Sequence, residues 1–204
     1  MNRTTTAGTA LAGSLASERH DAESAALPTT TNAIAQAAGS VLNAERCNAE
    51  RVAVALGHTV KRWREPKFAP RRATVAGLAS ALGMSAALLD ESLDALLEPV
   101  TAMSLEALAV KLPVANRLVG FVMPGNVPGA GIHEVCAALL AGAGLIVKTA
   151  SGEPLFFVNF MRTLAEVDAA VGARVAVVNF GRSEATAMRE LWARCDGGVV
   201  AYGD

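Results

Sequence analysis

The chain has 204 residues, a net charge of −1, 52% hydrophobic residues and 4% aromatic residues. Its length suits one large domain, or one domain with an accessory part. Its near-neutral charge gives no reason to expect nucleic acid or a membrane surface as a partner. No apolar run reaches the roughly 18 residues of a membrane-spanning helix, so no membrane span is expected.

The first segment, residues 1–31, is rich in Thr, Ser, Ala and Gly. Such a composition cannot bury enough apolar surface to form a core, so this segment is predicted to be a disordered tail. It has no continuous apolar stretch, and acidic residues follow soon after its first arginine. A signal peptide is therefore not expected.

Residues 32–115 are predicted to be helical, because apolar residues recur every three or four positions. One predicted face carries Val52, Leu56, Val60 and Trp63, and another carries Leu88, Leu89, Leu93, Leu96 and Leu97. The two prolines of the stretch EPKFAPRR and the pair Glu98–Pro99 are expected to end helices. The basic pairs Lys61–Arg62 and Arg71–Arg72 are expected on solvated helix faces.

From Leu118 onward, short apolar runs alternate with helical segments. The runs are LVGFVM, LIVKT, RVAVVNF and GGVVAYGD, and the segments between them are GIHEVCAALLAG, residues 153–167 and EATAMRELWARC. Ser183 is a candidate cap for the last segment. Apolar runs without polar alternation are typical of buried parallel strands. The order βαβαβαβ predicts the α/β class, with residues 116–204 forming a parallel-sheet, Rossmann-like half of the kind that binds nucleotides.

The turn after the first run has the sequence PGNVPGAG. Its glycines, Gly125, Gly129 and Gly131, lack the GxGxxG spacing of a dinucleotide-binding loop, and by themselves they indicate a tight turn from strand to helix. Asn126 lies just past the carboxyl end of the strand, where open α/β sheets bind ligands. Its side-chain amide can donate to a developing oxyanion. Alternatively, it forms hydrogen bonds within its own turn.

Lys148 ends the second apolar run, on the same edge of the predicted sheet. A lysine there can contact the hydroxyls or the phosphate of a nucleotide, whereas the alternative is a solvated strand end. The residue three positions further along is Ser151 rather than an acidic residue. A carboxylate at that position would repel a 2′-phosphate, so its absence is compatible with NADP.

The three cysteines, Cys47, Cys136 and Cys195, are odd in number and follow no CxxC or metal-ligand spacing. This usage indicates reduced thiols in a cytoplasmic protein, and no metal site is expected. His133 and Cys136 lie one helical turn apart, as a base and a nucleophile can. The simpler interpretation is a buried cysteine and a histidine near a helix N-terminus, and Cys195 is likewise interpreted as structural.

Taken together, the segments VMPGNVPG, LLAGAGLIVKTASGEP and VVAYGD, with the helical VKRWREPKFAPRR before them, resemble the acyl-CoA reductases of the LuxC family. The resemblance covers roughly residues 40–204 and is most specific over Gly125–Pro154. Because this family belongs to the aldehyde dehydrogenase superfamily, the resemblance implies an aldehyde dehydrogenase-like fold. It also implies NADPH-dependent reduction of a fatty acyl thioester to the aldehyde, a reaction for which bioluminescence is one setting.

By this resemblance, Asn126 helps to hold the thioester or aldehyde oxygen, and Lys148 contacts the adenosine ribose. The other positions implied at the cofactor are Pro124, Gly125, Thr149, Ser151 and Gly203. The nucleophilic cysteine of the family lies in a further α/β domain, and none of the three cysteines stands in its position.

The resemblance therefore implies a truncated, amino-terminal part of such an enzyme, inactive alone. Its substrate would be an acyl-CoA or acyl-protein thioester, and its partner a C-terminal half or a second copy of the chain. Because the chain stops after a strand, Val199–Tyr202 is expected to be exposed at the edge of the sheet.

Two alternatives stay open. In one, the chain is a nucleotide-binding fragment without catalysis. In the other, it belongs to a different aldehyde dehydrogenase relative that acts on small activated acids. The stretch GNVPGAGIHEV offers no arginine for the anion of such a small substrate.

Overall fold

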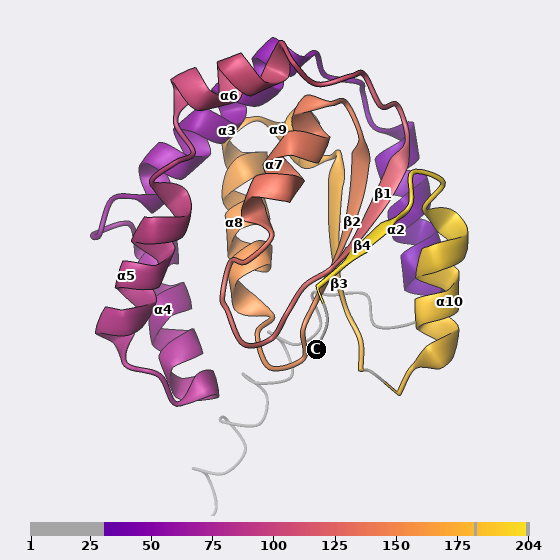
Figure 1. Cartoon of the computed structure of the whole chain (residues 1–204). Helices are drawn as coiled ribbons and strands as arrows, with labels where there is room; N and C mark the ends of the chain where they lie inside the picture. The colour runs from indigo at the N-terminus through magenta and orange to yellow at the C-terminus, as the bar shows by residue number, and fades with distance from the viewer. Residues whose placement is uncertain (1–30, 182, 203–204) are drawn as a thin grey trace, which may run out of the picture.

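The computed structural model describes residues 31–181 and 183–202, so the predicted tail lies outside the described residues except for Thr31. Figure 1 shows helices and strands in the order expected from the apolar runs. The helices are α2 (Thr31–Asn43), α3 (Ala49–Trp63), α4 (Ala69–Leu82), α5 (Ala86–Leu97), α6 (Ala102–Ala109), α7 (Ile132–Leu140), α8 (Leu155–Val167), α9 (Ala169–Gly172) and α10 (Ala185–Arg194). The strands are β1 (Leu118–Val122), β2 (Gly144–Thr149), β3 (Val175–Asn179) and β4 (Val199–Ala201).

The helices before the sheet begin and end where the sequence supplies caps and breaks. The side chains of Asn48 and Ser85 accept hydrogen bonds from backbone N–H groups in the first turns of α3 and α5, at 2.8 and 3.2 Å. α4 ends at Gly83, whose φ of 65° is a left-handed conformation that glycine adopts without strain. Residues 64–68, which include Pro66, separate α3 from α4, and Pro99 follows α5, so a break is confirmed at both predicted places. Pro70 differs from the prediction, because it lies in the first turn of α4 and does not end a helix.

The predicted apolar faces of α3 and α5 point into the core. On α3 the prediction is confirmed in full, because Val52, Leu56, Val60 and Trp63 are all buried. On α5 the buried residues are Leu89, Leu93 and Leu97, whereas Leu88 is exposed and Leu96 is partly buried. The buried stripe of α5 is thus narrower than its run of leucines, because residues four apart lie on one face.

Four parallel strands form one sheet in the order β3–β2–β1–β4. The interior strand β2 is buried along its whole length, as expected for a strand covered on both faces. β4 lies at one edge, pairs with β1 through Val199–Ala201 and leaves Val200 40% exposed. These observations confirm the α/β class, the parallel strands and the predicted edge strand.

The start of α10 differs from the prediction. Its N-cap is Glu184 rather than Ser183, and no side chain caps the helix. The Glu184 carboxylate instead accepts a hydrogen bond from the Gly181 backbone N–H at 3.0 Å. The expected role of Ser183 is therefore wrong, because the acidic side chain closes the loop before the helix.

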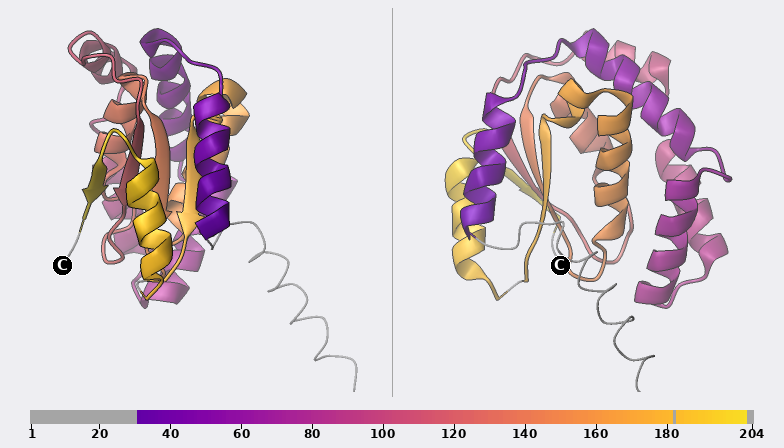
Figure 2. Two further views of the ribbon diagram at one scale, coloured as in Figure 1. Left: turned by 90° about the vertical axis from the view of Figure 1, so that its right-hand side faces the viewer. Right: turned by 180° about the vertical axis from the view of Figure 1, so that it is seen from behind.

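Helices cover both faces of the sheet, as the views in Figure 2 show. α7 and α8 pack on one face, and α2 and α10 pack on the other, so the sheet separates two apolar cores. The helices before the sheet contribute to both cores, because α2 contacts the strands and α10, while α3 contacts α7 and α8. The boundary predicted between residues 115 and 116 stays a prediction.

Trp63 connects the N-terminal helices to the sheet region. Its side chain is fully buried, and its ring centroid lies 5.3 Å from that of Phe156 and 5.5 Å from that of Phe160, both on α8. Its indole Nε1–H donates a hydrogen bond of 3.0 Å to the Thr163 hydroxyl on the same helix. α3 is therefore fixed to α8 by aromatic packing and by a satisfied buried donor.

Arg71 was expected on a solvated helix face, and the structure shows that this is wrong. The residue is only 1% exposed. Its guanidinium contacts the carboxylates of Asp90 and Asp94 at 2.9 and 2.6 Å and donates to the carbonyl oxygen of Trp63 at 3.0 Å. Periodicity could not reveal this role, because the acceptors come from α5 and from the end of α3.

Arg71→Met is expected to lower the free energy of unfolding by about 1–3 kcal/mol, because it removes the donor of a buried backbone carbonyl. The carboxylates of Asp90 and Asp94 are half-exposed, so water can solvate them when Arg71 is replaced. They therefore add little to the loss of stability. Urea denaturation measures the change. Arg72→Met, at the exposed neighbouring position, is the matched control, and an equal loss in both variants would contradict the structural role of Arg71.

Candidate functional site

A cavity of about 500 Å³ lies at the carboxyl ends of β1, β2 and β4. Its lining consists of Val122, Met123, Pro124, Gly125, Asn126, Lys148, Ala150, Ser151, Gly152, Met188, Ala201 and Tyr202. The strands are parallel, so their carboxyl ends share one edge of the sheet, which is where open α/β folds bind ligands. The cavity joins turns that are separate in the sequence.

The turn after β1 brings Pro124, Gly125 and Asn126 to the cavity. A Cβ atom at Gly125 would lie 3.1 Å from Ala150 Cβ, so glycine permits the close approach of the turns after β1 and β2. Gly131 has a φ of 89° and precedes α7 directly, which confirms the predicted tight turn from strand to helix. Asn126 is exposed, and its side chain forms no hydrogen bond to another described residue, so the alternative of a bond within its own turn is wrong.

Lys148 lines the same cavity from β2 but is only 4% exposed. The alternative interpretation of Lys148 as a solvated strand end is therefore wrong. Its Nζ lies 5.2 Å from the centroid of the Phe180 ring, within the range of a cation–π interaction. Ser151 is exposed at the cavity, and no carboxylate of a described residue lines it.

Thr149 and Gly203 are placed differently from the other predicted cofactor residues. Thr149 is buried and absent from the cavity lining. Its hydroxyl accepts a hydrogen bond from the Asn179 side chain at 2.9 Å and contacts the Val178 carbonyl at 3.4 Å. Thr149 therefore fastens β2 to β3, and Gly203 lies outside the described residues.

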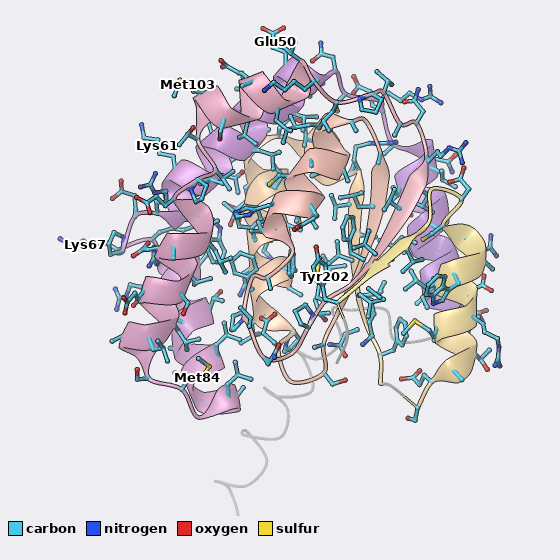
Figure 3. All side chains as sticks on the ribbon, in the orientation of Figure 1. Glu50, Lys61, Lys67, Met84, Met103 and Tyr202 are labelled. Atoms are coloured by element: carbon cyan, nitrogen blue, oxygen red, sulfur yellow. The ribbon has the colours of Figure 1, made fainter. Side chains whose placement is uncertain are left out.

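Sequence reasoning missed Tyr202 and Met188, which complete the cavity wall. Figure 3 labels Tyr202 where the strand ends converge. Burial, with a smaller contribution from the nearby Glu134 carboxylate, raises the pKa of Tyr202 to about 12. Its hydroxyl is buried without a hydrogen bond of normal geometry among the described residues. Tyr202 is the last residue of the predicted strand Val199–Tyr202, and this position at a strand end could have identified it as a cavity residue. Met188 is brought in by α10, and no signal in the sequence indicates it.

Glu153 supports the turn that carries Ser151 and Gly152. It is fully buried, and its Oε1 accepts a hydrogen bond of 2.9 Å from the Phe156 backbone N–H. Its second oxygen, Oε2, is buried without a partner among the described residues. Burial raises the pKa of this carboxyl to about 7, although hydrogen bonds from the Phe156 and Leu155 N–H groups act in the opposite direction.

The cysteines do not reach the cavity. Burial raises the pKa of Cys136 to about 12 and that of Cys195 to about 11, and the pKa of Cys47 is also raised by burial. Cys136 and Cys195 are both buried, as predicted, and an enclosed, protonated thiol is a poor nucleophile. His133 does not pair with Cys136, because its Nε2 lies 2.7 Å from the Leu96 carbonyl oxygen near the end of α5.

The described residues form neither a metal cluster nor a membrane-spanning helix. No group of three His, Cys, Asp or Glu side chains among them could hold a metal ion. In residues 31–181 and 183–202, none of the helices combines the length and apolar character needed to cross a bilayer.

A second cavity, of about 530 Å³, lies between α3 and the start of α6. Although it is slightly larger, its lining mixes the cations Lys61 and Arg64 with the anions Glu65 and Glu106. It also lies away from the strand ends, as the positions of Lys61 and Tyr202 in Figure 3 illustrate. The cavity at the strand ends is therefore the stronger candidate for a functional site.

Comparison with known proteins gives one family and one fold. Residues 111–204 match the family model described as acyl-CoA reductase (LuxC), and no curated protein matches the chain. Among solved structures, HpcC from Thermus thermophilus is similar, with 18% sequence identity and a TM-score of 0.63. The similarity covers 78% of this chain and 34% of HpcC, so the chain spans about a third of the length of that protein.

The likeness to HpcC, at this identity, shows the fold alone. The family match covers β1 to β4 and therefore includes every described residue that lines the candidate cavity. The C-terminal part of the chain, residues 111–204, is thus matched by the LuxC acyl-CoA reductase family, which confirms the resemblance over these residues. The resemblance of the helical stretch before residue 111 stays a prediction.

Proposed function

We propose that the cavity at the strand ends binds NADPH and that the chain serves the reduction of a fatty acyl-CoA, or another fatty acyl thioester, to the aldehyde. The observation that carries the proposal is the presence of Lys148 and Asn126 on one cavity that no described carboxylate lines. A cationic side chain in such a lining can donate hydrogen bonds to the ribose hydroxyls of NADPH and attract its 2′-phosphate.

The other cofactor contacts follow from the turns around Lys148. Pro124 and Gly125 bring the backbone after β1 to the cavity, and Ser151 offers a hydroxyl from the turn after β2. Thr149 contributes to the proposed site by holding the end of β2 beside β3. We include Gly203 in the proposal because it follows Tyr202 directly in the sequence.

Asn126 has the chemistry for the oxygen of the thioester. Its amide can donate a hydrogen bond to the carbonyl oxygen, on which negative charge develops as the carbonyl carbon is attacked. NADPH, when bound, would supply the hydride. The amide is neutral and exposed at the cavity. It can therefore donate a hydrogen bond to the oxyanion without any change in its own protonation state.

The nucleophile of the reaction is not among the described cysteines in this proposal. Cys136 and Cys195 are buried, with pKa values raised by that burial, and Cys47 does not line the cavity. The thiolate would come from a partner or a further part of the enzyme. The same observation favours the second candidate, a nucleotide-binding fragment without catalysis. NADPH-dependent formation of the aldehyde from a fatty acyl-CoA, when the chain is combined with the part that supplies the thiolate, would exclude this second candidate.

Lys148→Ala is expected to weaken NADPH binding by about tenfold or more, because a charged hydrogen-bond donor to the nucleotide contributes about 1.5–3 kcal/mol. Nucleotide fluorescence in a titration of the purified chain with NADPH, and separately with NADH, measures the dissociation constants. The NADPH constant should rise more than the NADH constant if the 2′-phosphate meets Lys148.

The matched control is Lys61→Ala, which removes an exposed lysine from the cavity between α3 and α6. This variant should bind NADPH like the unaltered chain. Weaker NADPH binding in Lys61→Ala, together with normal binding in Lys148→Ala, would indicate that the nucleotide binds in the cavity between α3 and α6. That result would overturn the proposal.

A further inference from the structure

Lys148 places a cationic head group in a nearly closed environment. The residue is 4% exposed, and moving an ammonium group out of water is costly unless other groups stabilise it. The Phe180 ring lies 5.2 Å from Nζ, and the electron-rich face of an aromatic ring attracts a cation at this distance. The Phe180 ring is thus one of the groups that stabilise the positive charge of Lys148.

The position of the Phe180 ring is fixed from several sides. Phe180 follows β3 directly, and Lys148 is paired in register with Val178 on that strand. Its side chain is 2% exposed, and it belongs to the core formed with α2 and α10 that includes Ile34 and Leu191. A buried ring in such a core has little freedom to move.

The strand ends are also tied together beside this contact. The Asn179 side-chain amide donates to the Thr149 hydroxyl at 2.9 Å and lies 3.4 Å from the Ala150 carbonyl oxygen. The backbone of β2 therefore cannot shift easily against β3. By contrast, the lysine side chain has four methylene groups and many rotamers of its own, so its head group is fixed by the groups that contact it, of which the Phe180 ring is one.

We infer that Phe180 is a positioning residue, whose ring holds the Lys148 ammonium at the wall of the cavity. The ring does not line the cavity, so it acts on a nucleotide only through the lysine. The inference deepens and rests on the proposed function, since it names a residue that sets the affinity of the proposed nucleotide site. Without the ring, the ammonium loses one of the contacts that fix its position, and NADPH binding weakens by about tenfold.

The first experiment observes the contact without any nucleotide. In a chain labelled with ¹³C-lysine, the ring current of Phe180 shifts the Lys148 ε-methylene proton signals upfield, and Lys148→Arg identifies these signals by their loss. Phe180→Leu is expected to return them toward the position of solvated lysines, whereas Phe180→Tyr keeps a ring and retains the shift. Unchanged Lys148 signals in Phe180→Leu would overturn the inference.

The second experiment measures the consequence. Phe180→Leu is expected to bind NADPH about tenfold more weakly, with Phe180→Tyr close to the unaltered chain. Phe157→Leu, at an equally buried phenylalanine on α8, makes the same loss of packing away from Lys148 and should retain binding. If the unaltered chain binds no NADPH, the proposed function fails, and the methylene signals alone then decide whether the ring holds Lys148.

Discussion

Glu153→Gln is expected to remove most of the pH dependence of stability between pH 5 and pH 8. Burial raises the pKa of Glu153 in the folded chain to about 7, against an ordinary value of 4.5. Between these two values the folded chain binds more protons at this group than the unfolded chain does, so stability falls as pH rises. The loss should amount to roughly 2–3 kcal/mol for the unaltered chain.

The structural origin of this effect is the unpartnered Oε2 of Glu153, which is buried with no hydrogen bond from a described residue. Protonation removes the buried charge, and glutamine resembles the protonated form in shape and charge. Urea denaturation at several pH values gives the free energies of unfolding. A slope in Glu153→Gln as steep as in the unaltered chain would assign the pH dependence to another group.

Glu166→Gln is the matched control for this series. Glu166 lies near the end of α8, the helix that Glu153 precedes. Unlike Glu153 it is exposed, and its carboxylate forms an ion pair with the Arg62 guanidinium at 3.5 Å. Exposed pairs of this kind contribute little to stability. The control variant should therefore retain the pH dependence of the unaltered chain. This result would assign the effect of Glu153→Gln to the buried carboxyl rather than to a general loss of negative charge.

Trp63→Ala is expected to lower the free energy of unfolding by about 3–5 kcal/mol, because it leaves a large cavity between α3 and α8. The indole packs on Phe156 and Phe160 and donates to Thr163. A loss of this size is a large fraction of the stability of a single domain. Thermal unfolding followed by circular dichroism, together with urea denaturation, measures it.

Trp192→Ala provides the comparison for Trp63, since Trp192 is 53% exposed on α10. Its removal should change stability by less than about 0.5 kcal/mol. The packing of α3 on α8 also predicts that the destabilised Trp63→Ala chain still unfolds in one transition. Two separated transitions, one for the helices before residue 115 and one for the sheet, would show that the N-terminal helices are independent of it.

The apolar runs of the sequence were sufficient to predict the sheet. Residues 145–147 have no polar alternation, and this pattern reflects the burial of β2 on both faces. The positions of Asn126 and Lys148 at the strand ends follow directly from the same reasoning, because parallel strands place their carboxyl ends on one edge. This part of the candidate site therefore follows from the sequence alone.

The remaining features depend on contacts between distant segments, which periodicity cannot reveal. Arg71 resembles any surface arginine in the sequence, and only the packing of α4 against α5 and the end of α3 brings acceptors to it. The burial of Lys148 depends on Phe180, thirty-two residues further along the chain, and on the core beneath α2 and α10. Met188 enters the cavity wall for the same reason, through the placement of a helix whose start was itself predicted incorrectly.

The most direct test of the proposed nucleotide site is an NMR titration of the ¹⁵N-labelled chain with NADPH, in which the chemical shift of each backbone amide is followed. Binding at the strand ends predicts shifts that centre on Gly125, Asn126, Ser151, Gly152 and Tyr202, with Gly57, Thr101 and Ala102 of the other cavity unaffected. Saturable shifts at the first group would show that the nucleotide binds at the carboxyl ends of the strands, as proposed. Shifts centred on the second group, or no shift in a folded chain at millimolar NADPH, would contradict the proposed nucleotide site.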